Sequence, residues 1–82
     1  MPKEKSIVTN NVKSIRSEKF KISQDALAKC IGVSRQTIVA IEKGAYAPSL
    51  ELAFRICYAF DEKIEDVFSF DPNKLKGGIN KL

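Results

Sequence analysis

The sequence predicts an all-α fold in which five helices enclose one compact core. Apolar residues recur at helical spacing along most of the chain, and we find no convincing strand. Ser23, Ser34 and Ser49 each stand directly before an apolar-periodic segment, where a hydroxyl can cap a helix. A length of 82 residues allows one domain with a small core.

The first expected element is an amino-terminal arm over residues 1–8, with a helix after it. This helix runs from about Thr9 or Asn10 to Lys19, with Val12 and Ile15 on its inner edge. The helical domain as a whole is expected to cover residues 9–70.

Residues 23–44 predict two short helices that are joined by a tight turn. The helix from about Gln24 to Ile31 ends at Gly32, which can adopt the left-handed backbone that a sharp stop needs. Val33 then places an apolar side chain at the corner, and the next helix covers about Arg35 to Lys43. The two helices are therefore held at a steep angle.

A loop must follow Gly44, because Pro48 disfavours helix at the residue before it. A fourth helix begins after Ser49, and a fifth covers Ile64 to Phe68. Residues 71–82 contain paired glycines and scattered apolar residues, and we expect a mobile tail there. The core stripe of the fourth helix is expected at Leu52, Ile56, Ala59 and Phe60.

The helix over residues 35–43 has an unusual outer face. At about 100° per residue, this face lies opposite Ile38 and Ile41 and offers an amide, two small apolar groups and a single cation. It fits the major groove of DNA, where Gln can pair with adenine, Arg with guanine, and a small apolar group can meet a thymine methyl. An ordinary solvated surface is the open alternative. The candidate base-contacting residues are Arg35, Gln36, Val39 and Ala40.

Two further polar residues of this region are candidates for the DNA backbone. Gln24 stands at the first position of its helix and Thr37 near the amino-terminal edge of the next one, where each can reach a phosphate. Glu42 is turned partly inward by the helical period, so its charge requires a partner.

Residues 23–44 resemble the helix-turn-helix of the phage repressor and Cro family, also called the Xre family of bacterial regulators. The segment Gly44–Ala53 is similar to the loop and fourth helix of that family, and Ile64–Phe68 to its fifth. The similarity covers roughly residues 10–68. It implies a lambda-repressor-like domain that acts as a transcriptional regulator, most simply a repressor, on an operator in double-stranded DNA.

The resemblance also implies roles for single residues. Lys43 and Tyr46 lie where the family contacts the opposite wall of the groove, so both are candidates for phosphate contacts. Gln24 would brace a residue early in the recognition helix. Arg16 resembles the arginine that pairs with the inward glutamate, here Glu42, in a structural ion pair.

The chain departs from the family pattern at two places. The link 20–23 is one residue longer than usual, which leaves the bend after the first helix open. At residues 61–63, Asp61 stands where relatives often have a glycine, and it can adopt the left-handed conformation or cap the next helix.

A homodimer is expected, because one recognition helix reads only a few base pairs and family members commonly pair around the fifth helix. The carboxyl-terminal part of the domain has more large apolar side chains than a short helix needs, with Tyr58 nearby. The alternative is that all of them pack inward in a monomer. The candidate interface residues are Ile64, Val67, Phe68 and Phe70.

The amino-acid composition favours some classes of function and argues against others. Fourteen basic and ten acidic residues give a net charge of +4, which favours a polyanionic partner. There is no histidine, so a metal site or histidine-based catalysis lacks its ligands, and we expect no metal, no cofactor and no enzyme. No apolar run has the length of a membrane span, which favours a cytoplasmic protein.

Two other classes of function stay open. The fold could serve a protein partner, as in the antitoxin half of a toxin pair, and an apolar tail that orders only with that partner would favour this. Cys30 and Cys57 are expected to be free thiols, and Cys30, beside Lys29, could make the protein a redox-responsive switch.

Overall fold

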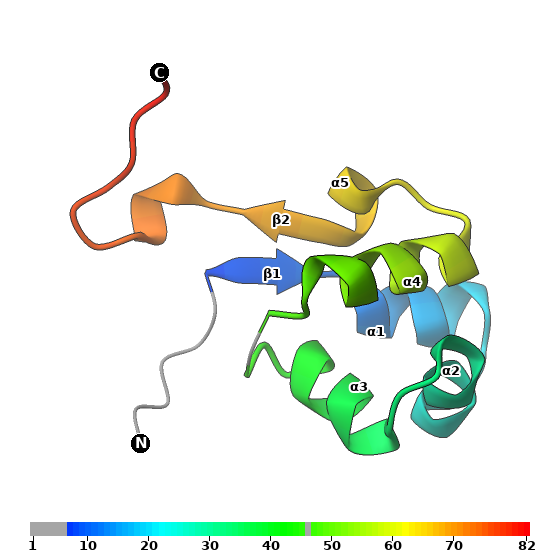
Figure 1. Ribbon diagram of the computed structural model, residues 1–82. Coiled ribbons are helices and arrows are strands. Elements are labelled where there is room, and N and C mark those ends of the chain that lie inside the picture. The colour runs from blue at the N-terminus through cyan, green and yellow to red at the C-terminus, as the bar shows by residue number, and fades with distance from the viewer. Residues whose placement is uncertain (1–6, 46) are drawn as a thin grey trace.

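The computed structural model describes residues 7–45 and 47–82, in which five α-helices surround one core and a two-stranded sheet lies beside them (Figure 1). The predicted helical fold is confirmed, with the sheet as an addition. The elements in chain order are β1 (Val8–Asn10), α1 (Val12–Ser14), the π-helix η1 (Ile15–Lys19), α2 (Gln24–Ile31), α3 (Arg35–Glu42), α4 (Leu50–Phe60), α5 (Ile64–Val67), β2 (Phe68–Phe70) and the 3-10 helix η2 (Pro72–Lys74).

The three predicted serine caps are confirmed. The hydroxyl of Ser23 accepts a hydrogen bond from the third residue after it at 3.0 Å, and those of Ser34 and Ser49 do the same at 3.2 and 3.1 Å. Each bond satisfies one backbone N–H group that the first turn of a helix leaves free. Helices α2, α3 and α4 therefore begin where the sequence indicates.

The turn between α2 and α3 depends on Gly32, whose φ is 80°. The N–H groups of Gly32 and Val33 both donate to the carbonyl of Ala28 at 2.9 Å, which closes the end of α2. Val33 is half-buried and packs against the core, as predicted. A Cβ atom at Gly32 would have Arg55 as its nearest neighbour at 3.7 Å, so there is space for a side chain and only the backbone conformation resists one.

Gly32→Ala should therefore lower the free energy of unfolding by about 1–2 kcal/mol, the cost of a left-handed backbone for a residue with a Cβ. Urea denaturation followed by circular dichroism measures this. Gly77→Ala is the matched control, because Gly77 has a φ of 84° in the exposed tail and should leave the midpoint unchanged. Equal losses in both variants would contradict the role given to Gly32.

The core lies where α1, α2, α3 and α4 meet, and α5 covers one side of it. Phe60 is its largest fully buried side chain, and Phe20 stacks on it with ring centroids 5.4 Å apart. In α4 the buried residues are Ala53, Ile56, Cys57 and Phe60, while Leu52 and Ala59 of the predicted stripe are half-buried.

The predicted start of the first helix is wrong, because Thr9 and Asn10 belong to β1. This strand pairs antiparallel with β2, with Val8 opposite Phe70 and Asn10 opposite Phe68 (Figure 1). The side-chain oxygen of Asn10, the last residue of β1, accepts from the N–H of Val12 at 3.0 Å, and Asn11 between them is the capping position of α1.

The longer link after the first helix is taken up by η1. The N–H of Phe20 donates at 3.1 Å to the carbonyl of Ile15, five residues earlier, which is the π-helical pattern. Such a turn contains more residues than an α-helical turn, so the extra residue widens the helix end. Lys21 then reverses the chain with a φ of 55°.

Asp61 ends α4 in the left-handed conformation, with a φ of 55°, which is one of the two roles expected for it. It does not cap α5: Lys63 precedes that helix, and no side chain caps it. Residues 71–82 are exposed throughout, and their mobility stays a prediction. Within the described ranges, no helix is long and apolar enough to cross a membrane.

Candidate nucleic-acid interface

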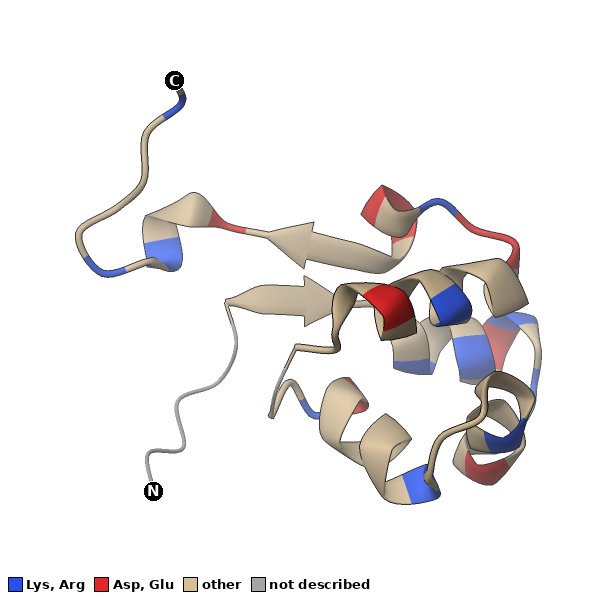
Figure 2. Cartoon of the chain, viewed as in Figure 1, with Lys and Arg blue, Asp and Glu red and all other residues tan. Residues whose placement is uncertain are grey.

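Helix α3 presents the outer face that its period predicts. Ile38 and Ile41 have no exposed surface and fix the helix to the core. Arg35 and Gln36 are exposed at its start, and the two small residues Val39 and Ala40 are half-buried. Between Arg35 and the glutamate at its end, α3 carries no charged residue (Figure 2).

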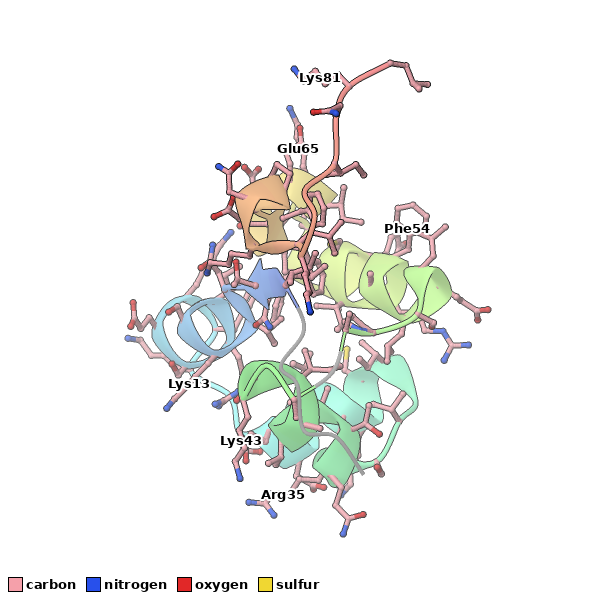
Figure 3. All side chains as sticks on the ribbon, turned by 90° about the vertical axis from the view of Figure 1, so that its left-hand side faces the viewer. Lys13, Arg35, Lys43, Phe54, Glu65 and Lys81 are labelled. Atoms are coloured by element: carbon pink, nitrogen blue, oxygen red, sulfur yellow. The ribbon has the colours of Figure 1, made fainter. Side chains whose placement is uncertain are left out.

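Arg35 and Lys43 stand at the two ends of this helix and extend from the same end of the molecule (Figure 3). Both are exposed. Two cations therefore flank a face of low charge. Tyr46, the other residue expected in this region, lies outside the described residues.

Thr37 is half-buried in the first turn of α3. Its N–H donates to the hydroxyl of Ser34, and the two hydroxyl oxygens are 3.0 Å apart. The structure thus assigns Thr37 a part in the helix cap. A phosphate contact by the same hydroxyl stays a prediction.

The inward charge of Glu42 is paired with Arg16. The Nε and Nη2 atoms of Arg16 donate to the two carboxylate oxygens at 2.7 and 3.2 Å, and its Nη1 donates to the carbonyl of Ile22 at 2.8 Å. The side chains of Arg16 and Glu42 are 10% and 3% exposed. The ion pair therefore joins the first helix, the link after it and the end of α3.

Gln24 is a third member of this network. Its Nε2 donates to Oε1 of Glu42 at 3.0 Å. The brace expected from the family resemblance, to a residue early in the recognition helix, is therefore corrected to the last residue of α3. Glu42 accepts from Arg16 and Gln24 together, so α2 and α3 are tied through one carboxylate.

Sequence reasoning missed a second support of α3. The Nδ2 atom of Asn10 donates to the carbonyl of Ile41 at 2.9 Å, so β1 holds the last turn of the helix. The short polar pair Asn10 and Asn11 was the available signal, because asparagine side chains often replace a helix's missing backbone partners.

The helix-turn-helix family model matches residues 12–67 of the chain, which span all five α-helices and both elements of the motif. The chain belongs to this Xre-like helix-turn-helix family. Relatives that are more than 50% identical over most of their length are named HTH-type transcriptional regulators, and this chain is a regulator of the same type.

Similar proteins occur in distant organisms. An uncharacterized HTH-type transcriptional regulator of Archaeoglobus fulgidus is 52% identical over 64 residues, which are 78% of this chain and 89% of the relative. One from Bacillus subtilis is 56% identical over 59 residues, 72% of this chain and 88% of the relative. A Bacteroides fragilis protein to which DNA binding has been ascribed shares the fold, with a TM-score of 0.67 at 21% identity over 76% of this chain and 98% of its own.

The candidate interface residues of this regulator differ in exposure. Val67 has no exposed surface and belongs to the core of its own chain, so its side chain is closed to a second copy. Ile64 and Phe68 are half-buried against the same core. Phe70 is 51% exposed, and Tyr58, expected nearby, is 89% exposed.

The two cysteines lie in different surroundings. Cys57 is buried, and this burial, together with the charge of Glu62, raises the pKa of its thiol. Cys57 therefore stays protonated and inert, as a small core residue. Cys30 is exposed at the end of α2. Among the described residues, no cluster of Cys, Asp and Glu could hold a metal ion.

Proposed function

We propose that this regulator represses transcription by inserting α3 into the major groove of an operator. The observation that supports this most directly is the outer face of α3, with Arg35 and Gln36 exposed above the buried Ile38 and Ile41. Arg35 and Gln36 have long polar side chains that can reach base edges, and the small residues that follow them on the same face let the helix approach the groove closely. Such a regulator acts in the cytoplasm.

The proposed contacts with DNA fall into two groups, those to base edges and those to phosphates. Those that read bases are Arg35, Gln36, Val39 and Ala40. Those that hold phosphates are Gln24, Thr37, Lys43 and Tyr46.

The operator in this proposal is two-fold symmetric and is bound by a homodimer. A single recognition helix meets only a few base pairs, which is too little information to single out one site. Two copies would place their recognition helices about 34 Å apart, one turn of DNA, in the major groove.

Selection of bound sequences from a random duplex pool tests the proposal. We expect an enriched inverted repeat with half-sites one turn apart, because each α3 would read one half-site. Failure to enrich any sequence, while the chain is folded by circular dichroism, would contradict DNA reading.

Lys43→Ala should weaken binding to all duplexes alike. A lost phosphate contact lowers the slope of log affinity against log salt by about one unit and leaves the preferred sequence unchanged. Fluorescence anisotropy over a range of salt concentrations measures this slope. Lys81→Ala is the control, because Lys81 lies at the opposite end of the molecule from Arg35 (Figure 3). An unchanged slope for Lys43→Ala would remove this residue from the interface.

The alternative is a protein-interaction module of the antitoxin type. It is favoured by the exposed apolar side chains of the tail, Leu75 and Ile79. Under this alternative the same selection enriches no sequence, and the tail becomes protected only when a protein partner is added.

A further inference from the structure

A groove lies where the end of α3 meets β1 and the segment after β2. It is lined by residues 7–10, by residues 42–44 and by Lys74 of η2. We call it the terminal groove. In Figure 1 the end of α3, the start of β1 and η2 all lie on the left-hand side of the molecule. Three segments that are far apart in sequence thus meet beside the helix that the proposed function places in DNA.

The terminal groove is positively charged. Lys43 and Lys74 are both exposed, and within the described ranges neither takes part in an ion pair. The acidic residue of the lining is Glu42, whose side chain is 3% exposed and is already bonded to Arg16 and Gln24. The charge of Glu42 is therefore compensated inside the protein, and the two ammonium groups remain for a ligand.

The strand pair fixes the place of Lys74. Phe70, the last residue of β2, lies opposite Val8 of β1. The carboxylate of Asp71 then accepts from the N–H of Asn73 at 3.0 Å, and the N–H of Lys74 donates to the carbonyl of Asp71 at 3.1 Å. These bonds turn the chain at η2 directly after the sheet. The backbone thus holds Lys74 beside β1 and the end of α3.

The segment that supplies Lys74 also carries most of the net charge of the chain. All ten acidic residues precede position 72, whereas residues 72–82 contain three lysines. This segment therefore accounts for three of the four net positive charges. It lies outside residues 12–67, the part that the family model matches. The charge that favours a polyanionic partner is thus concentrated next to the terminal groove.

We propose that the terminal groove holds the phosphate backbone of one DNA strand between Lys43 and Lys74. The inference rests on the proposed function and deepens it with a contact from outside the part that the family model matches. The groove has a volume of about 440 Å³, and a water molecule occupies about 30 Å³, so a phosphate group has room in it. Phosphates follow one another at about 3.4 Å of helix axis along a strand, so a strand bound at Lys43 brings further phosphates to Lys74.

Lys74→Ala in the full chain tests the inference, with Lys76→Ala as the matched control. Both variants lose one positive charge from the same exposed segment, but Lys74 lines the groove and Lys76 does not. We expect Lys74→Ala to lower the slope of log affinity against log salt by about one unit and Lys76→Ala to leave it unchanged. Fluorescence anisotropy with the selected operator measures the slope. Equal decreases in both variants would overturn the inference, because they would show an effect of net charge alone.

Two further variants test whether the lysines act as separate phosphate ligands. A variant with both Lys43→Ala and Lys74→Ala should lower the slope by about two units, because each side chain neutralises its own phosphate. Lys74→Arg should keep the wild-type slope, since arginine retains the charge. Circular dichroism verifies the fold of each variant. A double variant with the slope of Lys43→Ala alone would overturn the inference.

Ethylation interference on the operator locates the contact. Ethylation removes the charge of single phosphates, and it should impair binding of the wild type at phosphates next to those held by Lys43. At these phosphates it should no longer impair binding of Lys74→Ala. Identical patterns for the two proteins, with a lowered salt slope in Lys43→Ala, would overturn this inference alone. A wild type that binds no duplex would contradict the proposed function, and the inference with it.

Discussion

Glu42→Ala should lower the free energy of unfolding by about 3–5 kcal/mol, and Arg16→Ala should do the same. The reason is the burial of the pair: with 10% of the Arg16 side chain exposed, its guanidinium cannot recover in water the two bonds that it makes to the carboxylate. Gln24 would lose its acceptor as well. Removing one member thus leaves an unpaired charge inside the protein.

Chemical denaturation monitored by circular dichroism measures these losses, with Lys29→Ala as the control. Lys29 pairs with Asp25 at 3.2 Å, but the two side chains are 80% and 53% exposed, and exposed pairs contribute about 0–1 kcal/mol. Small losses in both Arg16→Ala and Glu42→Ala would show that the network does not hold the helices together.

Gln36→Ala and Arg35→Ala should each cost about 1–3 kcal/mol of binding free energy on the preferred operator. Both side chains are exposed at the start of α3, where a recognition helix contacts base edges. Because each would read particular base positions, the loss should come with a flattened preference at those positions. Repeating the random-pool selection with each variant measures both effects.

The comparison with Lys43→Ala decides whether the roles are correctly assigned. That variant should keep the wild-type sequence preference. If Lys43→Ala altered the preferred sequence while Gln36→Ala left it unchanged, the division between base and phosphate contacts would be reversed.

The parts of the fold that the sequence predicts well depend on residues whose effect falls on their own backbone or on backbone groups a few positions away. A serine cap acts on a backbone group three residues later, and Gly32 acts on its own backbone. The bounds of α2 follow from these signals, and the pairing of Arg16 with Glu42 follows from the helical period together with the family resemblance.

The missed features depend on partners far away in sequence. Each strand has only three residues, too few to show an alternating pattern, and each is a strand only because the other is present. The only trace of the π-helix in the sequence is that the link after the first helix is one residue longer than the family pattern.

The strand pair has a consequence for the motions of the recognition helix. Both strands lie outside residues 12–67, the part that the family model matches, and they join the two ends of the helical domain. A short sheet at the margin of a domain opens in local fluctuations that leave the core folded. Because Asn10 holds the carbonyl of Ile41, 31 residues away in sequence, each such opening also loosens the last turn of α3. The pairing of the two strands at the ends of the domain thus determines how rigidly the last turn of α3 is held.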